Sequence, residues 1–134
     1  EHLGEQTVII DCYNASPDSM KAAISVLAQM EPKNGGKRVA VLADMLELGE
    51  MSPELHESVG EMVVNAKIDK LICYGKYASY IAKRADELGL HSGSTVDKGM
   101  LLDYLKNTLR PNDVVLFKGS RGMKLEEVLE ELYK

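Results

Sequence analysis

Two hydrophobic periods alternate along the whole chain, and this alternation restricts the fold more than any other feature of the sequence. Five short apolar runs predict strands, at residues 7–10, 38–43, 70–74, 91–96 and 114–117. After each run, apolar residues recur at the three- and four-residue spacing of a helix buried on one face. The predicted helices occupy residues 17–30, 52–66, 77–88, 97–109 and 125–132. Strand–helix units repeated in this order predict a doubly wound, Rossmann-like α/β domain, with a mostly parallel sheet of five to six strands and helices on both faces.

The composition fits a single domain that spans residues 1–134. Apolar residues make up 45% of the chain and charged residues 28%, which are the proportions of a soluble globular protein. The formal net charge of −5 argues against a nucleic-acid partner, because nucleic acids need a basic face, and no apolar run is long enough to span a membrane. Cys12 and Cys73 follow strand-like runs and are expected to be buried free thiols, which predicts a reducing, cytoplasmic location.

Polar or glycine-rich segments follow three of the five predicted strands, at residues 11–16, 44–49 and 118–122. Parallel strands place their carboxyl ends at one edge of a sheet, where folds of this class bind their ligands. We therefore expect the three segments to meet at that edge, although they are far apart in the sequence. The other two strand ends, at residues 75–77 and 96–97, are typical of ordinary turns and caps.

The first segment predicts half of a nucleotide-binding site. Asp11 ends the strand, and Tyr13 and Asn14 lie in the turn. Ser16 and Pro17 begin the helix, whose N-terminus directs N–H groups and a positive dipole end toward a ligand. An acidic residue at a strand end is suited to bind ribose hydroxyls. A structural alternative explains Ser16 as a helix cap, but it requires neither Asp11 nor Tyr13.

The last segment predicts a binding site for a carboxylate or a phosphate. Lys118, Ser120 and Arg121 supply two cations and a hydroxyl, and two glycines allow close approach of the backbone. Cations beside a helix N-terminus are unfavourable because the dipole is positive there, and an anionic ligand would remove that cost. The alternative is a basic turn that only faces solvent.

The middle segment, residues 44–51, is rich in methionine, leucine and acidic residues. Its large apolar side chains pack either inside the domain or against another surface, as a lid or an interdomain contact, and both interpretations stay open. Glu47 in this loop and His56 in the following helix are candidates for a further ligand contact. The simplest expectation for His56 is a surface position.

The motifs of several self-contained enzymes do not occur in the sequence. It contains no P-loop, no glycine-rich dinucleotide loop after the first strand, no nucleophile elbow and no zinc-spaced His or Cys pairs. We therefore expect neither catalytic residues nor a metal site within the chain. The predicted site is interpreted as half of a site that another domain completes.

Three ordered motifs carry a resemblance that covers nearly the whole chain. Residues 11–20, Asp-Cys-Tyr-Asn-Ala-Ser-Pro-Asp-Ser-Met, are similar to the signature Asp-x-Tyr-Asn-Ala-Asn-Pro-x-Ser-Met, with Ser16 in place of Asn. The other two motifs are residues 42–49, followed by His56, and residues 116–126. Together they resemble the C-terminal domain of the Mur ligase family, in the branch that adds D-alanyl-D-alanine.

The resemblance implies an ATP-driven amide ligation, through an acyl phosphate, that joins D-Ala-D-Ala to UDP-MurNAc-tripeptide in peptidoglycan precursor synthesis. It implies two partner domains: a central domain that binds most of the ATP and Mg, and an N-terminal domain that binds the uridine nucleotide. By the same analogy Asp11, Tyr13 and Asn14 face the nucleotide, and Ser120 and Arg121 hold the dipeptide carboxylate. The isolated chain is then expected to catalyse no ligation. A stand-alone nucleotide-binding module that acts through partners remains the alternative.

Overall fold

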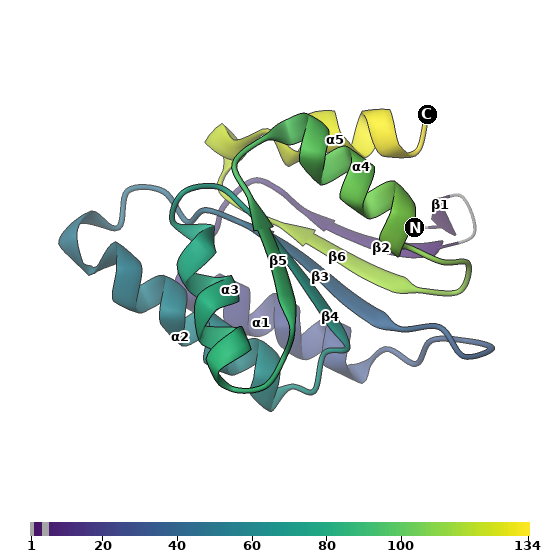
Figure 1. The fold of residues 1–134 in the computed structure, drawn as a ribbon, viewed down its shortest axis with the longest axis horizontal. Helices are drawn as coiled ribbons and strands as arrows, with labels where there is room; N and C mark the ends of the chain where they lie inside the picture. Colours follow the sequence, from purple (N-terminus) through teal and green to yellow (C-terminus); the bar gives the residue numbers. More distant parts are fainter. Residues whose placement is uncertain (1, 4–5) are drawn as a thin grey trace.

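The computed structural model describes residues 2–3 and 6–134, with the side chains of residues 6–134. These residues form one six-stranded sheet between two layers of helices (Figure 1). The strands are β1 (His2–Leu3), β2 (Gln6–Asp11), β3 (Arg38–Ala43), β4 (Lys70–Tyr74), β5 (Ser92–Thr95) and β6 (Val114–Lys118). The helices are α1 (Pro17–Gln29), α2 (Ser52–Asn65), α3 (Ala78–Glu87), α4 (Lys98–Thr108) and α5 (Leu125–Leu132).

The strand order is β1-β2-β6-β3-β4-β5, and all neighbours are parallel except β1, which pairs antiparallel with β2. The last strand of the chain, β6, is therefore inserted between β2 and β3 (Figure 1). In this register Asp11 at the end of β2 is the partner of Lys118 at the end of β6. The segments that follow β2, β3 and β6 consequently leave from adjacent positions on one edge of the sheet.

The helices divide between the two faces of the sheet. Figure 1 shows α1, α2 and α3 on one face and α4 and α5 on the other. Side chains of β3 alternate between the corresponding cores, because successive residues of a strand point to opposite faces. Ala40 and Leu42 pack with the first helix layer, whereas Val39, Val41 and Ala43 pack with the second. Both faces are covered, which explains why β3 is continuously apolar.

The predicted fold class is confirmed, and the five predicted strands and five predicted helices all occur. Observed boundaries differ from the expected ones by at most one residue at each end, and β2 and β6 extend to include Asp11 and Lys118. The short antiparallel β1 was not among the five predicted strands, because a two-residue strand leaves no hydrophobic period to detect. Among the described residues, no helix is long and apolar enough to cross a membrane.

Local signals in the sequence placed the helix starts correctly. Ser16 accepts a hydrogen bond from the backbone N–H of Ser19, and Pro17 is the first residue of α1. Asp97 accepts one from the backbone N–H of Met100 and so caps α4. Such caps are worth about 1 kcal/mol each and fix where the chain turns into the helix.

Both cysteines are free and buried, as expected. Burial, together with the carboxylates of Glu126 and Asp11, raises the pKa of Cys12 to about 11. Burial also raises the pKa of Cys73 well above its usual range. Neither thiol is therefore ionised near neutral pH.

Candidate functional site

The three polar segments meet in one hollow at the carboxyl edge of the sheet, as the sequence predicts. The hollow has a volume of about 500 Å³ and is lined from the loops after β2, β3 and β6, and we call it the three-loop hollow. Its lining residues are Tyr13, Asn14, Ala15, Ser16, Leu46, Glu47, Ser120, Arg121 and Gly122. The loops after β2 and β3 lead to helices on one face, whereas the loop after β6 leads to α5 on the other face. In open α/β sheets, ligands usually bind in the crevice at such a point, where neighbouring strands connect to helices on opposite faces.

Lys118 lies beneath this hollow rather than in its lining. Its side chain is 1% exposed, and Nζ donates to Asp11 Oδ2 at 2.7 Å and to the Asn14 carbonyl at 2.8 Å. The ammonium group therefore ties the end of β6 to the turn after β2. Asp11 is half exposed at 45%, so its carboxylate also reaches solvent at the edge of the site.

Ser120 connects the loop after β6 to the loop after β3, residues 44–51, which we call the middle loop. Its backbone N–H donates to the Asp44 carbonyl at 3.0 Å, and its Oγ accepts from the Leu46 N–H at 2.8 Å. Because Oγ accepts in the second contact, its own hydroxyl hydrogen remains to be donated elsewhere. Ser120 thus fixes the relative position of two walls of the hollow.

Tyr13 and Arg121 form an exposed pair at the mouth of the hollow. The Arg121 guanidinium lies 5.3 Å from the centroid of the Tyr13 ring, and the backbone N–H of Arg121 donates to the Tyr13 carbonyl at 3.2 Å. Tyr13 is 71% exposed, so the pair presents a flat aromatic face and a planar cation to solvent. A guanidinium held in this way can form two parallel hydrogen bonds with a carboxylate or phosphate.

The same pair borders a smaller hollow on its other side. That cavity has a volume of about 280 Å³ and is lined by Ile10, Cys12, Tyr13, Arg121 and Glu126. Tyr13 and Arg121 therefore form a ridge between two concave surfaces.

His56 is buried, so the expectation of a surface position is wrong. Its exposed fraction is 0%, because α2 packs this side chain inward against the middle loop. Nε2 accepts from the Met45 N–H at 2.9 Å, and Nδ1 lies 2.7 Å from the Ser52 carbonyl. Burial lowers the pKa of His56 below its ordinary value, while the Ser52 carbonyl and the Asp44 carboxylate act in the opposite direction. His56 does not line the three-loop hollow, whereas Glu47 does.

Some apolar side chains of the middle loop pack inside the domain and others lie at the surface, so each of the two interpretations from the sequence applies to part of the loop. Met45 is fully buried in the core of the first helix layer, whereas Leu46 and Met51 are 37% and 53% exposed. Internal packing therefore accounts for Met45, and the other two side chains remain available at the surface. Glu47 has a positive φ of 64°, a left-handed conformation that is costly for a residue other than glycine.

Asp44 has a structural role that the sequence did not indicate. The residue is 5% exposed, and its Oδ1 accepts from the Ala78 N–H at 2.6 Å, which caps the start of α3. Gly75 makes this contact possible, since its φ is 124° and a Cβ there would overlap the Asp44 carboxylate. The turn after β4, expected to be ordinary, is therefore tied to the same loop as the candidate site.

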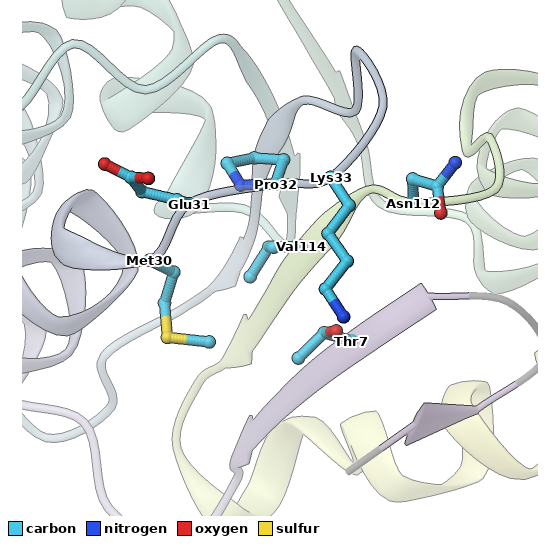
Figure 2. Close-up of a pocket in the computed structure, with 7 residues that line it drawn as sticks. All are labelled: Thr7, Met30, Glu31, Pro32, Lys33, Asn112 and Val114. Carbon is cyan, nitrogen blue, oxygen red and sulfur yellow. The ribbon is translucent and has the colours of Figure 1, made fainter.

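Another hollow, of about 390 Å³, lies at the opposite edge of the sheet (Figure 2). Figure 2 shows its lining from the starts of β2 and β6 and from the segment after α1, with Lys33, Glu31 and Met30 among the side chains. None of the three sequence motifs contributes to it. The carboxyl-edge hollow is therefore the candidate site.

No group of three or more His, Cys, Asp or Glu side chains that could hold a metal ion occurs in the described part of the chain, residues 2–3 and 6–134. The polar groups that line the three-loop hollow are the Glu47 carboxylate, the Ser16 and Ser120 hydroxyls, the Asn14 amide and the Arg121 guanidinium, beside the Tyr13 ring. This set can bind an anion or a flat polar ring system.

The fold and the hollow define a class of protein: a Rossmann-like α/β domain that presents three ligand-facing loops at the carboxyl edge of its sheet. Comparison with known proteins makes the assignment narrower. The family described as "Mur ligase, glutamate ligase domain" matches residues 1–121, and the chain belongs to this family of Mur ligase C-terminal domains.

Curated relatives and solved structures agree with this assignment. The chain is 40% identical to the UDP-N-acetylmuramoyl-tripeptide–D-alanyl-D-alanine ligase of Bacillus subtilis, covering 94% of this chain and 28% of the relative. It is also 40% identical to the ligase of the same name from Escherichia coli, covering 95% of this chain and 27% of that protein. The crystal structure of MurF ligase from Thermotoga maritima in complex with ADP superposes with a TM-score of 0.79 and 29% identity, over 99% of this chain and 29% of the other. The chain thus spans a little over a quarter of the length of these relatives.

Proposed function

We propose that the chain is the C-terminal domain of an ATP-dependent ligase that joins D-Ala-D-Ala to UDP-MurNAc-tripeptide, a step that builds peptidoglycan precursors in the cytoplasm. The names of the curated relatives support this proposal, as does the ADP complex of the Thermotoga maritima MurF ligase. Since the chain spans only part of these relatives, the remaining domains would supply the phosphate-binding and metal-binding groups.

The observation that carries the proposal is the convergence of the three family motifs on one hollow. Tyr13 and Asn14 come from the first motif, Glu47 from the second, and Ser120 and Arg121 from the third. Contacts between main chain and side chains hold the loops together at the three-loop hollow, so its shape is set before a ligand arrives. Such pre-organisation lowers the entropic cost of binding.

The nucleotide side of the proposed site consists of Asp11, Tyr13 and Asn14. The half-exposed Asp11 carboxylate can accept hydrogen bonds from ribose hydroxyls while Oδ2 keeps its contact with Lys118. The exposed Tyr13 ring offers a flat surface beside the ligand, and Asn14 lines the hollow. These residues would close over a nucleotide whose phosphates another domain binds.

The dipeptide side consists of Ser120 and Arg121, with Lys118 acting from below. Arg121 can bind the dipeptide carboxylate through two N–H groups, and the Ser120 hydroxyl hydrogen can be donated to the same carboxylate. Lys118 contributes its positive charge and holds the Asn14 carbonyl in place, rather than contacting the dipeptide directly.

The test is a chimera in which this chain replaces the matching C-terminal segment of the Bacillus subtilis relative. We expect phosphate release that depends on ATP and D-Ala-D-Ala from the chimera, and none from the 134-residue chain alone. A folded, ATP-binding chimera that does not use D-Ala-D-Ala would contradict the proposed substrate. Activity of the isolated chain would contradict its proposed role as one part of a larger site.

A binding measurement tests the residue assignments separately. We expect D-Ala-D-Ala to shift the amide NMR signals of Ser120 and Arg121 in the isolated chain. Shifts confined to other residues would show that the dipeptide binds elsewhere.

A further inference from the structure

His56 is in a single protonation state that its partners define. The Ser52 carbonyl can only accept a hydrogen bond, and it lies 2.7 Å from Nδ1, so Nδ1 carries the ring hydrogen. Nε2 is then unprotonated and accepts from the Met45 N–H at 2.9 Å. The ring is therefore neutral, in one tautomer, and both nitrogen atoms have partners within the domain.

Met45 lies between two residues that Ser120 holds. On one side, the Asp44 carbonyl accepts from the Ser120 N–H, and on the other, the Leu46 N–H donates to Ser120 Oγ. Met45 itself is fully buried, and its N–H is directed to His56. Loss of this acceptor would leave a buried N–H without a partner, which is unfavourable because nothing replaces the lost hydrogen bond.

We propose that His56 is a positioning residue for the three-loop hollow: its neutral ring holds Met45 and thereby fixes Leu46 and Glu47 against Ser120. This inference rests on the proposed function only in treating that hollow as the ligand site. His56 does not line the hollow, so it acts through the middle loop and not by contact with a ligand.

The contact depends on the charge of the ring. Protonated histidine donates from both nitrogen atoms, so Nε2–H would then oppose the Met45 N–H. The ionisable groups that face the ring are the Asp44 carboxylate and Tyr77, whose ring centroid lies 5.7 Å away. Asp44 Oδ1 accepts a hydrogen bond from the Ala78 N–H. The negative charge of Asp44 acts to raise the pKa of His56, but burial lowers it by more. Acidification is therefore expected to release Met45 and loosen the wall of the hollow.

The experiment uses NMR spectroscopy of the isotope-labelled chain over a pH series, with two variants at His56. In the wild-type protein, the amide signals of Met45, Leu46 and Ser120 should move together as the pH falls, with the midpoint of the His56 ring titration. His56→Gln can keep an acceptor for Met45 but cannot titrate, so the pH transition at these amides should vanish. His56→Leu has no acceptor, and the three amides should be displaced at every pH.

His91→Gln provides the matched control, because it removes a histidine whose side chain is fully exposed. His91 follows α3 and belongs to none of the three loops of the hollow. This variant should retain the wild-type pH transition at Met45. We also expect His56→Leu to bind D-Ala-D-Ala about tenfold more weakly, and His56→Gln to bind it nearly as well as the wild type.

Two results would overturn the inference. One is a Met45 amide whose pH transition does not follow His56, and this wild-type measurement is decisive even if His56→Leu does not fold. The other is a folded His56→Leu variant with unchanged Met45 and Ser120 amides. A wild-type chain that shows the coupled transition but no dipeptide binding would contradict the proposed function and leave the role of His56 in place.

Discussion

Lys118 Nζ lies 2.7 Å from Asp11 Oδ2, and the two partners differ sharply in their access to water: Lys118 is 1% exposed and Asp11 is 45% exposed. The pair joins the carboxyl ends of two neighbouring strands, β2 and β6. The two partners are therefore not equivalent. Water can hydrate the Asp11 carboxylate if Lys118 is removed, but it cannot reach the Lys118 ammonium group if Asp11 is removed.

Asp11→Ala should destabilise the domain more than Lys118→Met. The first substitution leaves a buried ammonium group with only the Asn14 carbonyl, at a cost of about 3 kcal/mol, whereas the second leaves a carboxylate that water can hydrate, at a cost of about 1 kcal/mol. Urea unfolding of both variants measures the difference. Equal losses, or a larger loss for Lys118→Met, would contradict the inferred asymmetry.

Arg121→Ala should weaken D-Ala-D-Ala binding at least tenfold, since loss of the charge-assisted pair with the dipeptide carboxylate costs about 1.5–3 kcal/mol. The substitution should leave the free energy of unfolding nearly unchanged. The Arg121 side chain is exposed and makes its ring contact with Tyr13 at the surface. Lys106→Ala removes the same charge from an exposed position on α4, so it controls for net charge. Calorimetric titration would reject the assignment if both variants lost affinity equally.

Stability should fall on acidification through a contribution from His56. Its pKa is lowered in the folded state, so the unfolded chain binds the proton more readily. The contribution is fully present above about pH 6.5 and is lost as the pH falls through the folded-state pKa. Unfolding free energies at several pH values should show a steeper acid loss for the wild type than for His56→Gln. Parallel curves would argue against this sign.

Gly75→Ala should be more destabilising than Gly89→Ala. Both glycines have positive φ, 124° and 101°, so both substitutions carry the cost of that conformation. Only at Gly75 would the new Cβ overlap its neighbours, which are the Asp44 carboxylate that caps α3 and the end of the Met123 side chain; nothing lies within 4 Å at Gly89. The difference between the two variants isolates this overlap and should be about 1–3 kcal/mol by thermal or urea unfolding.

Neither cysteine should react readily with iodoacetamide in the native protein at neutral pH. Burial raises the pKa of Cys12 to about 11 and that of Cys73 further, so the reactive thiolate is scarce at both positions. Mass spectrometry should show slow labelling of the native chain and rapid labelling in urea. Fast native labelling of Cys12 would indicate that the small hollow beside it opens in solution.

The strands and helices could be predicted because their signals are local. Hydrophobic period, the Ser16 and Asp97 caps and the glycine-rich strand ends each act over a few residues, and the structure confirms their positions. The meeting of the three polar segments also followed from the sequence, since parallel strands align their carboxyl ends. Insertion of β6 between β2 and β3 could not be predicted from such signals, because pairing between distant strands leaves no period in the chain.

Individual side chains of the site were harder to predict for a related reason. Lys118 and His56 are polar residues of types that usually lie at the surface, yet each is buried and bonded to a residue of another loop. Lys118 was expected to contact an anion, and the structure shows its Nζ bonded to Asp11 and Asn14. A helix face containing Ser52 and His56 four residues apart was the available signal for the buried histidine, but the sequence does not show which loop covers that face.

The position of β6 has a consequence for how the protein is made. A ribosome releases β2, β3, β4 and β5 well before residues 114–118, yet β2 and β3 have no contact in the sheet except through this last strand. The nascent chain can join β3, β4 and β5 early, but β2 must wait until residues 114–118 have been made. Premature termination before β6 is complete would therefore leave the first motif unconnected to the second in the sheet, and such a partial product could not assemble the hollow.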